Sequence, residues 1–215
     1  MIYGEVSVQE YPLYSRRDVS EALRMSHSTL YWWLRSNHRG SVISVSRHDR
    51  ALNFLQLSEA FAIAHMRKTL GISLSKIRQA SEYLRNNLGI RYPLINPGIR
   101  VGTDVYFRHA RDILLNASRH GQVESEELIG EYISRIAFGE EDLPDAVYPW
   151  IPGNERRSIQ INPRIRFGQP TIAGTGISVA AVRGRFEADE SPEDIAESYE
   201  ISHARVEDAL AYAAC

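Results

Sequence analysis

Residues 15–35 constrain the fold more than any other part of the sequence. Ser15 and Asp18 have the spacing of a capping box, and Ser26 supplies a second N-cap shortly after the first apolar stripe ends. Within each piece the apolar residues recur every three or four positions, as they do on one face of an α-helix. Two short helices joined by a turn of about three residues are typical of a helix-turn-helix, and this segment predicts one.

Three further elements are predicted before residue 90. Two β-prone pieces, at 41–45 and 51–54, surround a basic stretch at 46–50 and favour a hairpin, which would be the wing of a winged helix-turn-helix. Residues 57–70 have helical spacing and stop at Gly71. The next helix is capped by Ser73 and ends at Gly89, because glycine readily takes the left-handed conformation common at helix C-termini.

The character of the sequence changes at Tyr92. Prolines and glycines separate three short β-prone runs, at 99–101, 105–107 and 113–115, and predict a small antiparallel meander. Residues 125–138 have the pattern of an amphipathic helix, and residues 143–153, with three prolines, that of a linker.

The last sixty residues predict a strand at 158–161, a glycine-rich run at 167–179, and helices at 179–187, 191–199 and 202–213. The fold class is therefore α+β and mostly helical. Three domains are expected: a winged helix-turn-helix DNA-binding domain at 1–90, a connecting domain of antiparallel β-strands plus a helix at 91–155, and a trihelical domain at 156–215.

A net charge of −2 conceals a division of charge along the chain. Residues 1–91 hold 13 Lys and Arg against 7 Asp and Glu, whereas the remainder holds 12 against 20. A basic part joined to an acidic part suggests that the first part meets a polyanion. Chance surface composition is the alternative explanation.

The apolar runs, the first ten residues and the cysteine content of the sequence bear on its cellular location. No run of 18 apolar residues is long enough to span a bilayer, and the first ten residues lack the basic cluster and apolar region of a secretion signal. The single cysteine, Cys215, cannot form an internal disulfide. We expect a cytoplasmic protein without a membrane partner.

The predicted helix pair carries the candidate DNA-binding residues. A recognition helix presents its N-terminal side chains to base edges, and turning Leu30, Trp33 and Leu34 inward leaves a polar and aromatic face outward. Trp32 packed against another domain is the alternative for that residue. Arginines at the start of the first helix and a basic wing tip would add phosphate contacts. The full candidate set is Arg16, Arg17, His27, Ser28, Thr29, Tyr31, Trp32, Arg35, Arg47, His48 and Arg50.

Nothing in the sequence predicts catalysis. The seven histidines are scattered without a metal-ligand spacing, and no Ser-His-Asp or Cys-His order can be argued. The glycine-rich loop lacks the lysine of a P-loop and the spacing of a dinucleotide site. We therefore expect no cofactor, no metal and no catalytic residue.

Residues 26–33 (SHSTLYWW) and 70–78 (LGISLSKIR) resemble two phrases typical of MerR-type winged helix-turn-helix regulators. The resemblance implies that Tyr31 and Trp32 stand where that family keeps a basic and an aromatic backbone contact. Two features differ from the family. Arg24 replaces its turn glycine, so the turn must change geometry or adopt a positive φ, and a β-rich segment replaces its long dimerising coiled coil.

The C-terminal run resembles a second family. Gly168, Pro170, Gly174 and Thr175 fit the motif "glycine, x, proline, three residues, glycine, threonine" of the small trihelical domain of VapB-type antitoxins. With the MerR-like front, the whole chain resembles the longer antitoxins encoded beside VapC-like PIN-domain ribonucleases. The short form continues the motif with arginine, whereas this chain has Gly176.

The second resemblance implies a partner. A PIN-domain toxin carries a magnesium-binding carboxylate cluster, so an arginine of this chain placed into that cluster would inhibit it. We expect the partner to contact the four motif residues and Arg183 and Arg185, with Arg156 and Arg157 as the second choice. A plain solvated face is the alternative for Arg183 and Arg185.

The resulting hypothesis is a homodimeric, non-enzymatic antitoxin that binds operator DNA, represses its own operon and neutralises a PIN-domain ribonuclease. A ligand-responsive MerR-like regulator without a toxin is the first alternative, and a protein-interaction scaffold is the second. Salt-dependent DNA binding separates either regulator from a scaffold. Inhibition of a neighbour-encoded ribonuclease separates the antitoxin from the ligand sensor.

Overall fold

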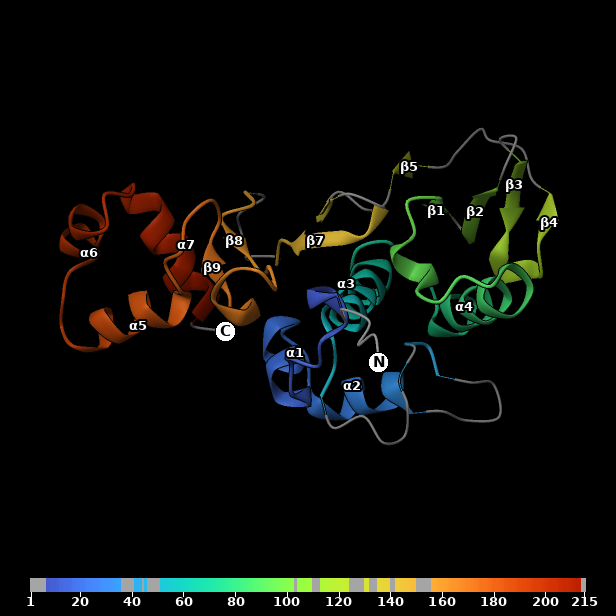
Figure 1. The fold of residues 1–215 in the computed structure, drawn as a ribbon, viewed down its shortest axis with the longest axis horizontal. Coiled ribbons are helices and arrows are strands. Elements are labelled where there is room, and N and C mark those ends of the chain that lie inside the picture. Colours follow the sequence, from blue (N-terminus) through green and yellow to red (C-terminus); the bar gives the residue numbers. More distant parts are fainter. Residues whose placement is uncertain are drawn as a thin grey trace, which may run out of the picture. The chain divides into compact units, whose positions relative to one another are not determined.

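A computed structural model gives the fold of this chain (Figure 1). It describes residues 7–35, 41–43, 45, 51–102, 104–109, 113–123, 130–131, 135–139, 142–149 and 156–213. The architecture is mixed α+β, about half helical with small sheets. The chain forms two compact units, the first comprising residues 1–134 and 138–144 and the second residues 135–137 and 145–215. The division into three domains at residues 90 and 155 stays a prediction.

The first unit begins with the predicted helix pair. After the 3₁₀ turn η1 (Val8–Glu10), α1 spans Arg16–Ala22 and α2 spans His27–Leu34. Ser15 accepts from the Asp18 amide at 3.2 Å while Asp18 accepts from the Ser15 amide at 2.7 Å, so the capping box is confirmed. Ser26 caps α2 by accepting from the Thr29 amide. Both helices therefore start where the sequence predicts.

The third helix starts earlier than its periodicity suggests. α3 spans Phe54–Lys68, and Asn53 and Gln56 form a second capping box at its start. The predicted helix start at residue 57 is wrong, and so is the predicted strand at 51–54, where only Leu52 pairs, through a bridge to Tyr14. The physical reason is that the Asn53 side chain accepts from the Gln56 amide, one of the amides at a helix start that have no partner within the helix. The proposed wing tip at 46–50 lies outside the described residues.

Helix α4 (Leu74–Leu88) carries the predicted apolar stripe and ends at Gly89, whose φ of +68° is the left-handed C-cap predicted for it. Arg85 of this helix lies 3.5 Å from the fully buried carboxylate of Glu59 on α3. The same guanidinium donates to the carbonyl oxygens of Ser41 (2.9 Å) and Val42 (2.6 Å). One arginine thus satisfies a buried charge and attaches the 41–43 segment to the helical core.

A five-stranded antiparallel sheet follows in the order β4-β3-β2-β1-β5. The predicted meander is confirmed as β1 (Ile99–Val101), β2 (Val105–His109) and β3 (Ile113–Asn116), with β4 at Gln122–Val123 beyond it. Two 3₁₀ turns flank it, η2 (Pro93–Ile95) and η4 (Ala117–Arg119). Helix α4 packs on η4 and on β2, so the sheet shares the core of the first unit.

The helix predicted at 125–138 is wrong where the structure describes that segment. Gly130–Glu131 form β5, which pairs with Val101 and Arg100 of β1, and Ile136–Phe138 form β6. Pairing with strands distant in sequence overrides the local helical spacing, and Gly130 is a poor helix former. Within the predicted linker, Pro144–Val147 form β7, the partner of β6.

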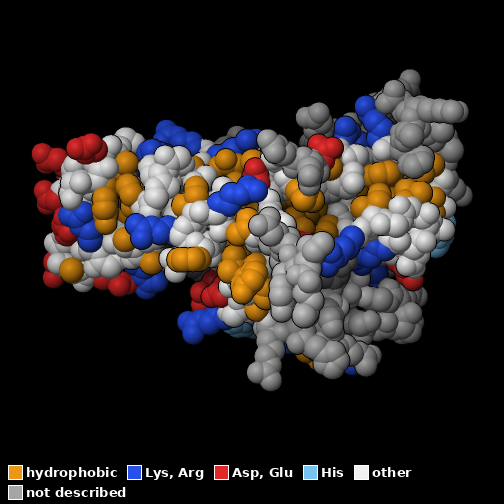
Figure 2. All heavy atoms as spheres, in the orientation of Figure 1, with side chains coloured by type: hydrophobic (Ala, Val, Ile, Leu, Met, Phe, Trp, Pro, Cys, Tyr) orange, Lys and Arg blue, Asp and Glu red, His pale blue; other side chains and the backbone are white. Residues whose placement is uncertain are grey.

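In the second unit, β8 (Ile159–Gln160) pairs with β9 (Thr171–Ile172), with the 3₁₀ turn η6 (Arg166–Gly168) between them. The three predicted helices are present as α5 (Val179–Glu187), α6 (Pro192–Ser198) and α7 (His203–Ala213). They close over a core of Ile159, Ile172, Val179, Val182, Ile195, Ala196, Val206 and Ala209. Figure 2 shows acidic side chains gathered over the end of this unit that α5 and α6 form.

Candidate nucleic-acid interface

The turn between α1 and α2 keeps the left-handed conformation without glycine. Arg24, which stands in place of the turn glycine of MerR-type regulators, adopts a positive φ of +48°. This left-handed conformation costs free energy in a residue with a Cβ atom. Its carbonyl oxygen and that of Leu23 both accept from the Lys68 ammonium, at 3.2 and 3.3 Å. The end of α3 therefore holds this turn in place.

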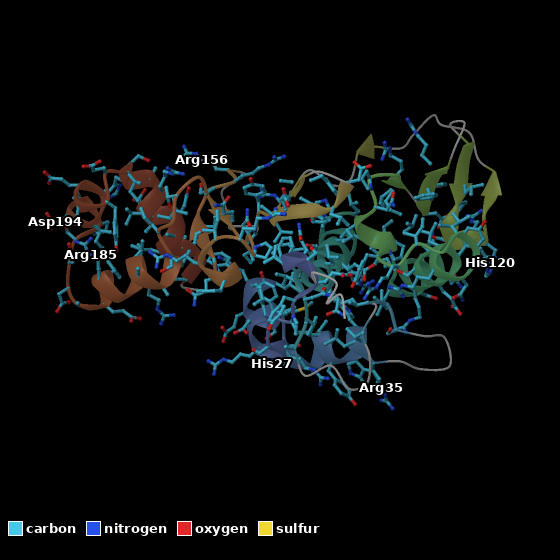
Figure 3. All side chains as sticks on the ribbon, viewed as in Figure 1. His27, Arg35, His120, Arg156, Arg185 and Asp194 are labelled. Carbon is cyan, nitrogen blue, oxygen red and sulfur yellow. The ribbon has the colours of Figure 1, made fainter. Side chains whose placement is uncertain are left out.

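Adjacent tryptophans of α2 face opposite ways. Trp33 is 4% exposed and packs inward with Leu30 and Leu34, as predicted, whereas Trp32 is 57% exposed and Tyr31 48%. The apolar stripe of Leu30 and Leu34 admits only one of the two neighbouring tryptophans, and helical spacing places Trp33 in it. The outward face of α2 is thus aromatic, and Figure 3 shows His27 and Arg35 marking its two ends.

Three outward side chains of α2 contact one another. The Tyr31 ring meets Trp32 edge-on with centroids 5.9 Å apart, and the Arg35 guanidinium lies 5.2 Å from the Trp32 centroid. Stacking on the indole orients the arginine while leaving its donors available. We call Tyr31, Trp32 and Arg35 the aromatic-arginine ladder.

The ladder borders a groove that the sequence did not reveal. Trp32 and Arg35 line it from α2, and Leu74 and Arg78 line it from the first turns of α4, around a volume of about 480 Å³. Two arginines and an indole around one open groove suit a sugar-phosphate chain. In the sequence, the only signal for this groove was Arg78, five residues after the Ser73 cap. Periodicity within one helix cannot show that α4 lies close to α2.

The N-terminus of α2 gathers short hydroxyls. The Ser26 hydroxyl lies 2.9 Å from those of Ser28 and Thr29, and all three residues are exposed. Hydroxyls at a helix start can serve either phosphates or base edges, and the helix dipole there favours an anion. The predicted residues Ser28 and Thr29 are therefore placed where such a contact is possible.

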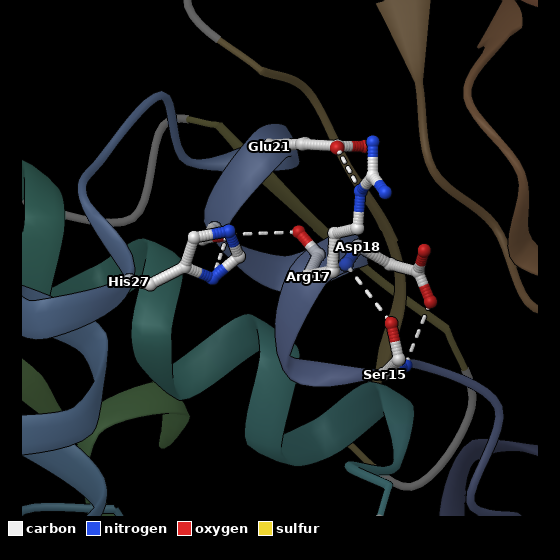
Figure 4. Close-up of polar contacts among 6 residues, drawn as sticks. Ser15, Arg17, Asp18, Glu21 and His27 are labelled. Carbon is white, nitrogen blue, oxygen red and sulfur yellow. Dashed lines mark hydrogen bonds and ion pairs between the residues drawn. The ribbon is translucent and has the colours of Figure 1, made fainter.

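His27 is oriented by α1 (Figure 4). The Ser20 hydroxyl donates to the Arg17 carbonyl at 2.9 Å and lies 3.1 Å from Nδ1 of His27. This contact holds the exposed imidazole ring of His27 against α1.

The two arginines of α1 differ. Arg17 forms an exposed i,i+4 pair with Glu21 at 2.7 Å, and that hydrogen bond raises the pKa of its guanidinium. Arg16 is exposed and has no ion-pair partner among the residues the structure describes. A phosphate would have to compete with Glu21 for Arg17 but not for Arg16. The remaining candidates, Arg47, His48 and Arg50, lie outside the described residues.

The predicted partner-binding residues of the second unit are placed as follows. Gly168 is buried with φ of +77°, Gly174 has φ of +72°, and Pro170 is half-buried between them. The Thr175 hydroxyl donates to the Ile172 carbonyl and accepts from the Ile177 amide, so it closes its own turn. These residues shape a rigid loop pair.

The arginines proposed to enter a toxin already have partners within the unit. Arg183 pairs with Glu187 at 2.7 Å, and Arg185 pairs with Glu190 and lies 4.8 Å from the Tyr199 centroid. The hydrogen bond to Glu190 raises the pKa of the Arg185 guanidinium. Arg156 and Arg157 are exposed, the latter 5.5 Å from the Tyr148 ring centroid (Figure 3). Insertion of any of these arginines into a partner stays a prediction.

Two features are absent from the described part of the chain. There, no group of three or more His, Cys, Asp and Glu side chains is arranged to hold a metal ion. Within the same residues, no helix is long and apolar enough to cross a membrane.

Comparison with known proteins gives three kinds of similarity. Residues 159–213 match the family model described as "Protein of unknown function (DUF433)". Two proteins of Mycobacterium tuberculosis (strain ATCC 25618 / H37Rv) are each 24% identical: "Putative antitoxin VapB45", covering 94% of this chain and 93% of that protein, and "Uncharacterized protein Rv2308", covering 96% and 92%. The crystal structure of Rv2018 from Mycobacterium tuberculosis, at 20% identity, has a TM-score of 0.67 over 93% of this chain and 97% of that one. The overall fold is therefore shared with a solved structure.

Proposed function

We propose that this chain is a non-enzymatic antitoxin that binds operator DNA through α1 and α2 and neutralises a toxin protein, a PIN-domain ribonuclease, by direct contact. The end-to-end similarity to a relative named as an antitoxin supports the antitoxin role. The observation that carries DNA binding is the exposed aromatic-arginine ladder beside a buried Trp33. A solvent-facing tryptophan stacked on arginine lies outside the core and leaves an indole face and guanidinium donors available to a nucleic acid.

In this proposal α2 enters the major groove with its N-terminus first. Ser28 and Thr29 reach base edges, while Arg16 and Arg35 neutralise phosphates on either side. Trp32 packs against a deoxyribose, and the groove that it shares with Arg78 accepts the adjoining backbone. Phosphate contacts fix position and the helix N-terminus reads sequence.

A homodimer completes the proposal. Two copies would place two α2 helices in successive major grooves roughly 34–36 Å apart, so the operator would be an inverted repeat. Occupancy of that operator would repress the operon that encodes the pair. The protein would act in the cytoplasm, where both the DNA and the ribonuclease are found.

Fluorescence anisotropy with a labelled duplex from upstream of the chain's own reading frame tests the DNA arm. Arg35→Ala is expected to weaken binding about tenfold and to reduce the slope of log affinity against log salt by about 0.9. Arg183→Ala is the matched control, since it removes one exposed guanidinium from the second unit. Equal losses for both variants would show a nonspecific charge effect and refute an interface on α2.

The toxin arm needs a separate measurement. The ribonuclease encoded beside this chain should lose its activity on a fluorogenic RNA when the full-length chain is added, at a stoichiometry set by the complex. Undiminished ribonuclease activity at saturating chain would refute the antitoxin role, whatever the DNA result.

A further inference from the structure

Phe167 is the most exposed large hydrophobic side chain among the described residues, with 85% of its surface open. It sits at the tip of the 162–169 loop of the second unit, in η6. An aromatic ring left in water at this degree of exposure contributes nothing to the core of its own unit. The Phe167 ring is therefore accessible to a partner outside the unit.

The backbone under the ring is held in an unfavourable conformation. Arg166, Phe167 and Gly168 are consecutive left-handed residues, with φ of +49°, +55° and +77°, and only the third is glycine. Non-glycine residues rarely adopt this region, and such strain persists only where surrounding structure over-determines it. Local strain of this kind gathers at binding sites.

Backbone hydrogen bonds within the loop hold these residues in the left-handed conformation. The amides of Ile165 and Gly168 donate to the carbonyls of Asn162 and Ile165, both at 3.0 Å, and Gln169 donates to Arg166 at 3.2 Å. The base of the loop is fixed because Pro163 and Gly168 are buried. The loop thus fixes the backbone from which the ring projects, which lowers the entropy cost of binding.

Arg166 gives the tip its charge. Its Nε donates to the Gly176 carbonyl at 2.9 Å, which joins this loop to the turn that contains Gly174 and Thr175. The terminal nitrogens of Arg166 have no ion-pair partner among the described residues, and the residue is exposed. Next to it, Arg164 already pairs with Asp145. The tip therefore presents an aromatic ring beside one available cation.

We propose that Phe167 is the anchor by which this chain docks on its toxin, entering an apolar pocket whose rim carries carboxylates that pair with Arg166. The inference rests on the proposed antitoxin function and names the contact within it. Buried aromatic anchors dominate interface energetics, and a flanking arginine selects an acidic rim. A second copy of the chain and nucleic acid are the competing occupants.

The experiment uses the full-length chain and the ribonuclease encoded beside it. Phe167→Ala is expected to weaken the complex at least about 30-fold, the size of a hot-spot loss. Phe167→Asn should lose as much, because asparagine tolerates the left-handed backbone and so preserves the loop while removing the ring. Phe186→Ala is the control, since Phe186 is the other exposed phenylalanine of this unit, at 47%, and it should bind like the wild type.

Two further readouts separate the competing occupants. Under the proposal, Phe167→Asn leaves both the duplex affinity and the oligomeric mass from light scattering unchanged. A loss of mass would assign the ring to a second copy, and a loss of duplex affinity would assign it to DNA; either result overturns the proposal. If Phe167→Asn still binds and inhibits the ribonuclease as the wild type does, the anchor is wrong while the antitoxin function stands. If the wild type binds no ribonuclease, the antitoxin function itself is wrong and the anchor falls with it.

Discussion

Two helix pairs in this chain have the same local backbone and opposite charge. Between α1 and α2, three amides reach back four, three and five residues, from Leu23, Arg24 and Met25. Between α6 and α7, the amides of Tyr199, Glu200 and Ile201 make the same three contacts. The second turn residue is left-handed in both, with φ of +48° at Arg24 and +54° at Glu200.

The side chains reverse the electrostatics of these two pairs. Residues 15–35 hold four arginines against two carboxylates, while residues 191–213 hold six carboxylates against one arginine. Each second helix even begins with histidine, but His27 contacts the Ser20 hydroxyl whereas His203 lies 3.1 Å from Glu193. Helix pairs joined by the same turn therefore need not bind the same partner, because the surface charge decides which polymer can approach.

The largest expected effect separates the two neighbouring tryptophans of α2. Trp33→Ala should lower the free energy of unfolding by about 3–5 kcal/mol, because it empties a packed core position. Trp32→Ala should change it by no more than about 0.5 kcal/mol, since its ring is exposed. Urea unfolding followed by circular dichroism measures both. Similar losses for the two variants would mean that Trp32 is also packed, which would remove the basis for the ladder.

A buried carboxylate gives the next effect. Asp104 is 1% exposed, and its carboxylate forms ion pairs with Nζ of Lys76 at 2.5 Å and with Nε of Arg119 at 3.0 Å. Burial pushes the pKa of Asp104 upward, but the hydrogen bonds from Lys76 and Asn116 and the charges of Lys76 and Arg119 outweigh it, so its pKa lies below the ordinary value. Lys76, one of the basic residues of the 1–91 segment, is thus paired within the first unit with a buried carboxylate.

Asp104→Asn should therefore lower the free energy of unfolding by about 1.5–3 kcal/mol at pH 7. A carboxylate with a depressed folded-state pKa stabilises above its unfolded pKa of about 3.9, and this contribution is lost as the pH falls through the folded value. The gap between wild type and variant should be constant from pH 5 to 7 and shrink below about pH 4. Urea titrations at these pH values test this, and a gap that widens in acid would contradict the assigned pKa direction.

The charge contrast itself can be measured on DNA. Replacing Arg16 and Arg17 together with glutamine should weaken binding to a labelled duplex about tenfold and reduce the salt slope by up to about 1.8. The matched double variant Glu193→Gln with Asp194→Asn, on the first turn of α6, should leave the affinity unchanged. Tighter binding by that second variant would place the acidic helix pair close to the duplex.

The smallest expected effect tests the shared turn. Arg24→Gly and Glu200→Gly should each raise the free energy of unfolding by about 0.5–1 kcal/mol, because glycine relieves the left-handed strain but has more freedom to lose on folding. Thermal unfolding of the two single variants gives the comparison. Opposite signs would show that the two turns, alike in backbone, are held by different forces.

Sequence reasoning succeeded where the determinants are local. The caps at Ser15 and Ser26 and the three C-terminal helices follow from residues within one turn of each boundary. It failed at the start of α3, because the β-prone run 51–54 predicts a strand while Asn53 within it caps a helix together with Gln56. It failed again at Gly130–Glu131, because pairing with β1 is a long-range event that no local pattern encodes.

The candidate site divides in the same way. The inward turn of Leu30, Trp33 and Leu34 could be predicted from periodicity. The groove completed by Leu74 and Arg78 could not, since it depends on where α4 lies against α2. The left-handed tip at Phe167 was equally hidden, because a single exposed phenylalanine in a glycine-rich run is indistinguishable in sequence from a core residue.

The attachment made by Arg85 has a practical meaning for engineering. The Arg85 guanidinium donates to the backbone carbonyl oxygens of Ser41 and Val42. These two hydrogen bonds do not involve the side chains at those positions. A replacement segment between α2 and α3 would have to deliver these two carbonyl oxygens to Arg85 and also fill the fully buried positions of Val42 and Ile43. Arg85 is thus a fixed attachment point for the segment that connects α2 to α3.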